Sequence, residues 1–301
     1  MKIHFIKINT VPGELLIATE VKERKFSAPL HYHPELELTL ILESSGKRFI
    51  GDSIQNFEPD DLVLVGENLP HFWRNDSNLL KDGFSRAIVV QFNKSFLGES
   101  FFTLNGANHI NRLIKNSTRG VCFRDPITKA LIKDKLIRLL ELDTFEKALG
   151  LLEILNILAK SDICYLSSPE YKAHFNEIDC TRLNKVFNYV YNNINSSFEI
   201  SEIADLLNMS VSAFCHYFKK RTQKTFMQFI NETRIGKAKR LLIETDKSIA
   251  EIAYESGYNS LSNFNKQFNS LEKLSPKLFR KKYYDYANDL PDVPEHLEYD
   301  S

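Results

Sequence analysis

One stretch near the C-terminus decides how the chain is interpreted: Ser248-Ile-Ala-Glu-Ile-Ala-Tyr-Glu-Ser-Gly-Tyr-Asn-Ser-Leu-Ser-Asn-Phe-Asn-Lys-Gln-Phe268. Its first Ser is a helix-capping residue, and two Ile residues follow at the spacing of one helix face. Ala253 is small enough for a second helix to cross closely, and Gly257 suits the tight turn that follows. Phe264 and Phe268, four residues apart, share one face of the next helix. The stretch therefore predicts a helix-turn-helix unit.

A second copy of this pattern lies earlier in the chain, in Ile200-Ser-Glu-Ile-Ala-Asp-Leu-Leu-Asn-Met-Ser-Val-Ser-Ala-Phe-Cys-His-Tyr-Phe218. Its small residue, Ala204, and its turn residue, Asn208, each precede their counterparts by 49 positions. Asn tolerates the positive φ of a turn better than most residues. Ser201 is expected to cap the first helix of this copy. Because each copy must place a small residue, a turn and two aromatics together, a duplicated unit is a specific signal.

The segment between the copies and the charge of this region both point to DNA. Phe226–Glu244 predicts one helix of about 19 residues, hence about 28 Å long, which is close to the ~34 Å between successive major grooves. Residues 183–283 hold 16 Lys and Arg against 9 Asp and Glu, a net charge of +7, whereas residues 1–182 have a net charge of −1. A basic domain beside a neutral one is expected to be the part that meets a polyanion.

Residues 183–283 resemble the C-terminal DNA-binding domain of the AraC/XylS family of bacterial transcription regulators. The resemblance rests on Ile249-Ala-Glu-Ile-Ala, Gly257-Tyr-Asn-Ser-Leu-Ser-Asn-Phe, Leu274-Ser-Pro276 and Phe279-Arg280, with Phe218-Lys-Lys, Phe229-Ile-Asn-Glu-Thr-Arg234 and Ala238-Lys-Arg-Leu-Leu. It covers about a third of the chain and is highly specific. The resemblance implies that the second helix of each unit reads DNA bases. The base-reading residues would be Ser212, Cys215, His216, Leu261, Ser262, Asn265 and Lys266.

The basic side chains of this region are predicted to bind phosphates, which supply affinity rather than sequence selection. They are Lys219, Lys220, Arg221, Arg234, Lys239 and Arg240. Three positions depart from the family pattern: Gln223 and Lys273 replace glycines usual after the recognition helices, and Asn208 replaces a turn glycine. Loss of a C-terminal glycine costs up to about 1 kcal/mol. The first recognition helix also lacks Arg and bidentate amides, so its base preference is hard to infer.

The N-terminal hundred residues predict β structure. Leu36-Glu-Leu-Thr-Leu-Ile-Leu42 alternates apolar and polar residues for part of its length, and Asp61–Val65 and Ala87–Phe92 are short branched runs. Strands at this spacing without intervening helices indicate an antiparallel sandwich or barrel. Further on, Ile127–Leu142 and Thr144–Ala159 show helical periodicity and are expected to pair with each other or with a second subunit.

Histidines mark the candidate site of this half. His31 and His33 precede Glu37 on what the spacing predicts to be one strand, and His71 opens a second motif, His-Phe-Trp-Arg-Asn. The pattern resembles the two motifs of the cupin superfamily, in which three His and one Glu bind a divalent metal. The resemblance implies a closed β-barrel that senses an effector, with Fe, Mn, Ni or Zn as candidate ions.

Two other interpretations of the histidines stay open, namely a polar pocket without metal and a purely structural role. Trp73, the only Trp of the chain, stands beside Arg74 next to His71. An aromatic face and an Arg suit a carbohydrate or a carboxylate, whereas a half-buried Trp at the rim of the domain is the alternative. The candidate effector pocket is His31, His33, Glu37, His71 and Trp73, and no cofactor beyond the optional metal is required.

The predicted fold is a multidomain α+β chain. It comprises a cupin-like antiparallel β-barrel, a helical segment for dimerisation, and an all-α domain with two helix-turn-helix units. The expected boundaries are residues 1–105 for the barrel, 106–182 for the helical linker, 183–283 for the DNA-binding domain and 284–301 for a disordered acidic tail.

Several classes of protein are disfavoured. No apolar run reaches the ~18 residues of a membrane span, and the N-terminus lacks the pattern of a signal peptide. Cys122, Cys164, Cys180 and Cys215 form no CxxC pair, so a disulfide framework or a zinc knuckle is not indicated. A reducing cytoplasm and no membrane contact are therefore expected.

These patterns predict a transcription factor, not an enzyme. We expect it to bind operator DNA as a homodimer, to respond to a sugar or related metabolite, and to contact RNA polymerase if it activates. One alternative is a metal-dependent oxygenase or isomerase fused to a DNA-binding domain, which metal analysis and a turnover assay would separate. Another is an architectural DNA-bending protein, which the β-rich half disfavours because bending DNA needs no pocket.

Overall fold

The protein is described by a computed structural model that places residues 15–75, 84–98, 100–169, 171, 177–195 and 198–288. Contacts divide the chain into two compact units. One consists of Met1–Tyr191 with Glu199–Phe229, and the other of Asn192–Phe198 with Ile230–Ser301. Each helix-turn-helix unit therefore falls in a different compact unit.

Six strands of the first unit form an antiparallel sheet in the order β1-β7-β2-β5-β8-β9. They are β1 (Leu16–Glu23), β2 (Leu36–Glu43), β5 (Leu62–Val65), β7 (Ser85–Phe92), β8 (Val121–Phe123) and β9 (Ile163–Tyr165). Successive side chains of a strand point to opposite faces. In β2, Leu36, Leu38 and Leu40 are therefore buried on one face, while Glu37 and Ile41 point to the other. The predicted strands β2, β5 and β7 are confirmed, whereas β8 and β9 lie in the segment expected to be helical.

A second sheet of three short strands has the order β4-β3-β6. Its strands are β3 (Gly46–Ile50), β4 (Ser53–Phe57) and β6 (His71–Asn75). The closed barrel expected from the sequence is wrong, because the strands of the described residues are not paired into a ring; they form two separate sheets. For a closed barrel, both edge strands of the smaller sheet would have to pair with strands of the larger sheet through continuous backbone hydrogen bonds. Across the described residues, β4 pairs only with β3, and the bridge of His31 to His71 beside β6 is isolated.

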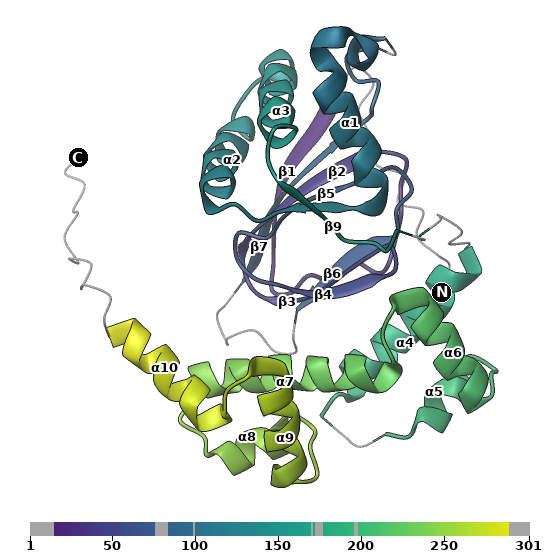
Figure 1. Ribbon diagram of the computed structural model, residues 1–301, viewed down its shortest axis with the longest axis vertical. Helices are drawn as coiled ribbons and strands as arrows, with labels where there is room; N and C mark the ends of the chain where they lie inside the picture. Colours follow the sequence, from purple (N-terminus) through teal and green to yellow (C-terminus); the bar gives the residue numbers. More distant parts are fainter. Residues whose placement is uncertain are drawn as a thin grey trace. The chain divides into compact units, whose positions relative to one another are not determined.

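Helices cover the outer face of the larger sheet (Figure 1). They are η1 (Phe101–Thr103), η2 (Asn105–Ala107), α1 (Asn108–Asn116), η3 (Ser117–Arg119), α2 (Pro126–Leu139) and α3 (Thr144–Leu158). Asp125 and Asp143 accept backbone N–H bonds at the starts of α2 and α3, as N-terminal caps do. The two long amphipathic helices predicted in this region are confirmed. A core cluster of leucines and isoleucines joins them to β2 and β5.

The remaining helices form the C-terminal part of the chain. They are α4 (Glu177–Asn193), α5 (Ile200–Leu206), α6 (Val211–Thr222), α7 (Phe226–Glu244), α8 (Ile249–Glu255), α9 (Leu261–Glu272) and α10 (Pro276–Asn288). The single helix predicted at Phe226–Glu244 is confirmed. Within the expected acidic tail, α10 continues through Asn288, and residues 289–301 lie outside the described residues. None of the described helices is long and apolar enough to cross a membrane.

Two recognition helices end in a left-handed residue that is not glycine. Gln223 after α6 has φ 55°, and Lys273 after α9 has φ 59°. A side chain in this conformation costs about 1 kcal/mol relative to glycine. We therefore expect Gln223→Gly and Lys273→Gly each to raise the free energy of unfolding by about 0.5–1 kcal/mol in urea denaturation followed by circular dichroism. Ser270→Gly, inside α9, is the control and should lower it.

Candidate functional site

The first helix-turn-helix, α5 and α6, is built around a turn with a positive φ. Asn208 has φ 53°, as its type predicts, and the next N–H, that of Met209, donates to Ala204 O at 2.9 Å. Ser210 caps α6 through its side chain. The prediction that Ser201 caps α5 is wrong: α5 begins at Ile200, so Ser201 lies inside the helix.

The second unit, α8 and α9, repeats this construction with a stronger start. Ser248 and Glu251 form a reciprocal capping box, which holds the pKa of Glu251 below its ordinary value through hydrogen bonds from Ser248. Tyr258 N donates to Ala253 O at 3.0 Å, the counterpart of the bond at Met209. Because the turn of this copy holds one more residue, α9 follows α6 at an offset of 50 positions instead of 49.

Gly257 is required at this turn for two independent reasons. Its φ is +85°, and a Cβ there would lie 2.3 Å from Ile194 O and 2.8 Å from Arg234 Nε. The carbonyl of Ile194 belongs to the backbone, so it cannot move away as the end of a flexible side chain can.

We therefore expect Gly257→Ala to destabilise the second unit by more than 1 kcal/mol and to weaken binding to DNA. Asn208→Gly tests the equivalent turn of the first unit, where a glycine should be tolerated or stabilising. Both effects can be measured by urea denaturation, and equal stability of the two variants would contradict the close approach at Gly257.

The two recognition helices expose the same positions. In α6, Phe214 and Phe218 are fully buried, and in α9 Phe264 and Phe268 are. The predicted base-reading side chains lie on the opposite, accessible face of each helix. Ser212, His216, Leu261, Ser262 and Lys266 are exposed, while Cys215 and Asn265 are half-buried. Three predicted residues of α6 thus occupy the same positions as three of α9, while Leu261 corresponds to Val211, which is exposed but was not predicted.

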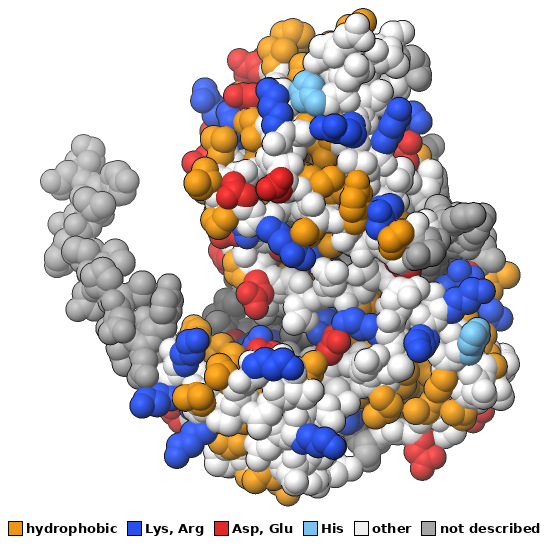
Figure 2. Space-filling view, in the orientation of Figure 1, with side chains coloured by type: hydrophobic (Ala, Val, Ile, Leu, Met, Phe, Trp, Pro, Cys, Tyr) orange, Lys and Arg blue, Asp and Glu red, His pale blue; other side chains and the backbone are white. Residues whose placement is uncertain are grey.

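The predicted phosphate-binding cations differ in availability. Lys219 and Lys220 are exposed at the end of α6, where Lys and Arg side chains gather (Figure 2). Arg221 is paired with Asp179 at 2.6 Å, and Lys239 with Glu272 at 3.0 Å. Arg240 is 3.4 Å from Glu244.

Two basic residues of α7 make contacts within the protein. Arg234 lies between the rings of Phe198 and Tyr258, and burial lowers the pKa of its guanidinium. Lys237 is buried and donates to Asn195 Oδ1 at 2.7 Å and to Glu255 O at the end of α8. Burial lowers the pKa of Lys237 as well. Sequence composition cannot separate such residues from surface cations.

A second candidate site lies between the two sheets, where the predicted histidines and Glu37 converge. His31, His33, Glu37 and His71 are all buried, and their candidate ligand atoms lie within 4.8 Å of one another. The prediction that His31, His33 and Glu37 share one strand is wrong, because β2 begins only at Leu36, after a bend. The four side chains therefore meet through this bend and through the bridge of His31 to His71, not through strand alternation.

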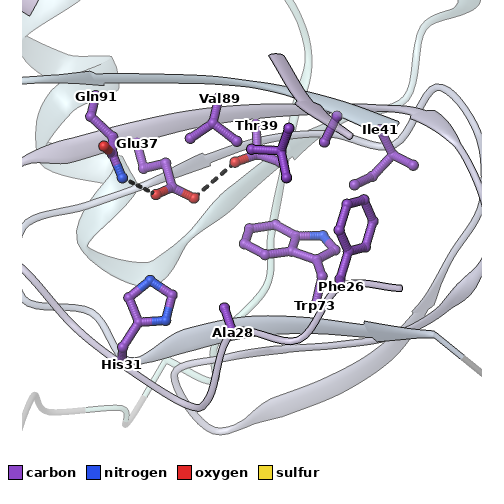
Figure 3. A pocket seen from close by; sticks show the side chains of 11 residues that line it. Phe26, Ala28, His31, Glu37, Thr39, Ile41, Trp73, Val89 and Gln91 are labelled. Carbon is purple, nitrogen blue, oxygen red and sulfur yellow. Dashed lines mark hydrogen bonds between the residues drawn. The ribbon is translucent and has the colours of Figure 1, made fainter. Parts of the chain in front are cut away.

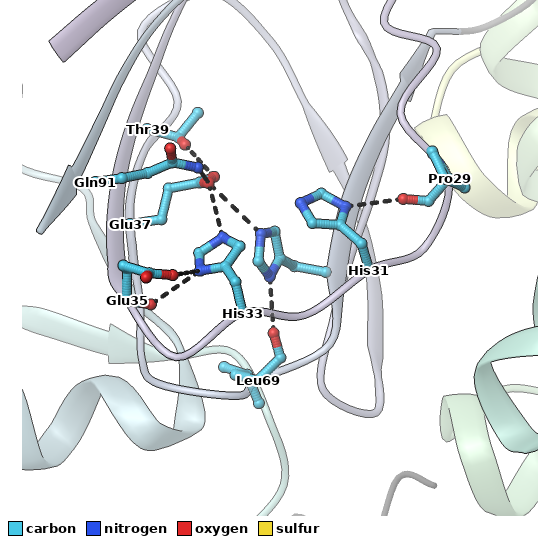
Figure 4. A network of polar contacts seen from close by, with 9 residues as sticks. Pro29, His31, His33, Glu35, Glu37, Thr39, Leu69 and Gln91 are labelled. Carbon is cyan, nitrogen blue, oxygen red and sulfur yellow. Dashed lines mark hydrogen bonds and ion pairs between the residues drawn. The ribbon is translucent and has the colours of Figure 1, made fainter. Parts of the chain in front are cut away.

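Each histidine is oriented by a backbone carbonyl (Figure 4). His31 Nδ1 lies 2.9 Å from Pro29 O, His33 Nδ1 3.1 Å from Glu35 O, and His71 Nδ1 2.7 Å from Leu69 O. A carbonyl only accepts, so each Nδ1 carries a proton, and in a neutral ring the Nε2 then presents a lone pair. Metal-binding histidines are commonly fixed in this way by their second nitrogen.

Glu37 is held with equal precision. Thr39 Oγ1 donates to Glu37 Oε1 at 2.8 Å, and Gln91 Nε2 donates to Glu37 Oε2 at 2.8 Å. Burial alone would raise the pKa of Glu37, but the charge of His71 and the hydrogen bond of His33 hold it well below its ordinary value. Burial, followed by the charge of His71, lowers the pKa of His31 to about 3, so this ring is neutral near pH 7.

The cluster fits a divalent cation. His33 Nε2 lies 3.2 Å from Glu37 Oε2, and His71 Nε2, which has no hydrogen-bond partner among the described residues, lies 3.7 Å from the same oxygen. Lone pairs facing a carboxylate repel it unless a proton or a cation lies between them. Neutral imidazoles with one carboxylate are a donor set suited to Zn²⁺, Fe²⁺, Mn²⁺ or Ni²⁺.

A cavity of about 190 Å³ adjoins the cluster on the side of His31 and Glu37 (Figure 3). Trp73 and Phe26 line its other end, with Ile41 nearby. The sequence did not point to Gln91, Thr39 or Phe26 as lining residues. For Gln91 in β7 and Thr39 in β2, the alternation of side chains along a strand was the available signal, because alternate residues share one face. Arg74, expected beside Trp73, is not among the lining residues and donates instead to Asn188 of α4 at 2.9 Å.

Comparison with known proteins places the C-terminal helices in a family. A family model described as a helix-turn-helix domain matches residues 203–282. The HTH-type transcriptional activator RhaR of Mannheimia succiniciproducens is 22% identical over 277 residues, which cover 91% of this chain and 94% of that protein. An uncharacterized HTH-type transcriptional regulator in the cgkA 5′ region of Pseudoalteromonas carrageenovora is 32% identical over 116 residues, covering 38% of this chain and 69% of that protein.

Solved structures share this region too. The DNA-binding domain of AdpA, a global transcriptional factor crystallised with a target DNA, has 24% identity and a TM-score of 0.35, covering 36% of this chain and 98% of that one. An AraC-type regulator from Chromobacterium violaceum has 22% identity and a TM-score of 0.33, covering 36% and 96%. Together with the sequence relatives, the two helix-turn-helix units identify this chain as a member of the AraC/XylS family of DNA-binding transcription regulators, and not as an enzyme.

Proposed function

We propose that the protein regulates transcription by binding specific DNA sequences and that its N-terminal sheets sense a small molecule. The observation that supports this most directly is the repeated recognition helix. Two helices with the same buried Phe pair present the same accessible positions. This suits the binding of both helices to base edges in the major groove of one duplex. The protein would act in the cytoplasm on double-stranded operator DNA, with RNA polymerase as a further partner where it activates.

The two kinds of contact have separable effects on binding. Base contacts select sequence, whereas phosphate contacts add affinity on every duplex and make it salt-dependent. His216 and Lys266 occupy equivalent exposed positions of α6 and α9 and represent the first kind. Lys220, exposed at the end of α6, represents the second.

DNA selected by the protein from a random pool supplies the test. We expect His216→Ala and Lys266→Ala to reduce discrimination between selected and random duplexes by about 1–3 kcal/mol. Lys220→Ala should weaken both duplexes alike and reduce the slope of log affinity against log salt by about one. Lys239→Ala is the matched control, because its ammonium is already paired with Glu272. If His216→Ala and Lys220→Ala reduced binding to both duplexes equally, the assignment of base readers would be wrong.

We propose that the protein is a homodimer through the helical layer of residues 106–182. Large apolar side chains are exposed there: Ile127 by 80%, Phe145 by 68% and Leu149 by 54%. Figure 2 shows hydrophobic side chains among charged ones over this layer. Exposed apolar clusters of this kind commonly mark an interface with a partner subunit.

We further propose that His31, His33, His71 and Glu37 hold a divalent metal. The carbonyl-fixed histidines support this, as does His71 Nε2, which finds no hydrogen-bond partner in the part of the chain that the structure describes. When bound, the metal would supply one or more open coordination positions toward the cavity and a local positive charge.

Within the first compact unit, β6 connects this site to the first helix-turn-helix. His71 and Trp73 point into the interior, whereas Phe72 and Arg74, the alternate residues, contact α4. The ring of Phe72 lies 5.0 Å from that of Phe187 in α4. Phe187 in turn contacts the buried rings at the start of α7 and in α6. An occupied cavity could therefore bias the position of α4.

The segment before His31 is also joined to α4. Asn184 Oδ1 accepts from Leu30 N at 2.8 Å, and Asn184 Nδ2 donates to Leu30 O at 3.0 Å. One side-chain amide thus binds one residue's backbone as a neighbouring strand would. His31, the next residue, lines the cavity, so two separate connections reach α4 from the proposed sensor.

Asn184→Ala tests this connection in the protein alone. The variant leaves the Leu30 N–H and C=O without partners, which should cost about 1–3 kcal/mol. In the parent protein, urea unfolding followed by Trp73 fluorescence and by helical circular dichroism should share one midpoint for this unit. In the variant we expect the two midpoints to separate. Asn156→Ala, which removes a hydrogen bond to His109 in the helical layer, is the control. Coincident midpoints in the Asn184 variant would argue against the connection.

A further inference from the structure

The cavity between the sheets has two chemically different ends. His31, Glu37, Thr39 and Gln91 form a polar end next to the histidine cluster, as Figure 3 shows. The rest of its lining is hydrocarbon or aromatic: Val21, Phe26, Ala28, Ile41, Trp73, Ala87 and Val89. A ligand that fills this space must therefore be polar at one end and apolar over the rest of its surface.

The size of the cavity limits the ligand to a small molecule. Its volume is about 190 Å³. A cavity of about 150 Å³ holds one benzene ring, whereas drug-sized ligands need about 300 Å³ or more. The space therefore suits one ring, or a short chain, with a single head group.

The charge of the lining decides what the head group is. None of the eleven described residues that line the cavity is a Lys or an Arg, and the buried guanidinium of Arg48, on the strand beside Trp73, is paired with Asp61 at 3.0 Å. Glu37 is the acidic residue of the polar end, and the described lining holds no Lys or Arg to offset its carboxylate. With a divalent ion bound by Glu37 and neutral imidazoles, the same end has a net charge of about +1.

The apolar end of the cavity offers few hydrogen-bond partners to the hydroxyl groups of a polyol. Each hydroxyl buried there without a partner costs about 1–3 kcal/mol, and a sugar presents several around its ring. A carboxylate needs polar partners only at its own end of the molecule. Of the two ligand classes that an aromatic residue beside a histidine suggests, the lining favours the acid.

We propose that this cavity binds a small monocarboxylate in a metal-dependent manner, with its carboxylate on the ion held by the histidine cluster and its apolar body against Trp73 and Phe26. The inference rests on the proposed sensing function and deepens it. It assigns the metal to effector recognition: no reaction is involved, and the ion is the source of positive charge that the described lining residues lack.

Trp73 is the single tryptophan of the chain and lines the cavity, so its fluorescence reports ligand binding there. Full-length protein is treated with EDTA and then reloaded with Zn²⁺, or with Co²⁺ to follow the cluster by visible absorption. Benzoate and hexanoate are the acid probes, benzamide is the matched neutral ring, and glucose and rhamnose are the polyols. We expect benzoate or hexanoate to change Trp73 emission with at least tenfold higher affinity than benzamide or either sugar. The acid affinity should fall at least tenfold in EDTA-treated protein.

Three variants separate the parts of the proposal. Glu37→Gln should weaken Co²⁺ binding and the acid response together. Ala87→Leu fills part of the cavity and should reduce acid affinity at least tenfold while the Co²⁺ spectrum remains. His109→Gln, a histidine outside the cluster whose ring binds Asn156, should change neither.

The outcomes distinguish this inference from the proposed function. Failure to bind Co²⁺ or Zn²⁺, equal response to benzamide, or acid binding that survives EDTA overturns the inference. If the same preparations still select specific DNA from a random pool, the regulatory function stands without it. Loss of sequence-selective DNA binding by correctly folded protein would instead contradict the proposed function.

Discussion

In β6, successive side chains point to opposite faces of the sheet, so one five-residue strand serves two different environments. His71 and Trp73 take part in the histidine cluster and the cavity, while Phe72 and Arg74 contact α4. A shift of this strand by one residue would move all four side chains to the wrong face. The register with β3, which pairs Phe72 with Phe49 and His71 with Ile50, therefore fixes the site and the helix contact together.

The helical half of the protein could be predicted from sequence in detail because its determinants are local. A turn residue must have a positive φ, and the small residue before it must allow a close crossing; both act within a few positions of the chain. Asn208 and Gly257 satisfy the first condition, and Ala204 and Ala253 are fully buried at the second. The same local character explains why α2, α3 and α7 were placed within a few residues of their observed ends.

The β-rich half was predicted only in part, because its determinants are distant in sequence. β8 and β9 are three residues long and are strands only because they pair with β5 and with each other. The four-residue cluster was anticipated by motif, but not its assembly around a bend before Leu36. Likewise, Lys237 and Arg221 have the composition of a DNA-binding surface, yet one is buried against Glu255 O and the other is paired with Asp179. Only tertiary contacts distinguish a structural cation from one that is free to meet a phosphate.

The unequal recognition helices acquire a rationale from these contacts. α9 offers Asn265 and Lys266, side chains suited to base edges, whereas α6 offers Ser212, Cys215 and His216, which would make weaker or less selective contacts with bases. It is α6, not α9, that belongs to the compact unit containing the sheets, the cavity and α4. A helix that binds bases weakly has little binding free energy to oppose a movement of the elements that it packs against. In the proposed mechanism, control by a ligand would be most effective at α6, because a modest coupling free energy of about 1–3 kcal/mol is comparable to the contribution of one bidentate base contact. Under the proposed function, α9 would supply constant recognition, and α6 would supply the part that an effector changes.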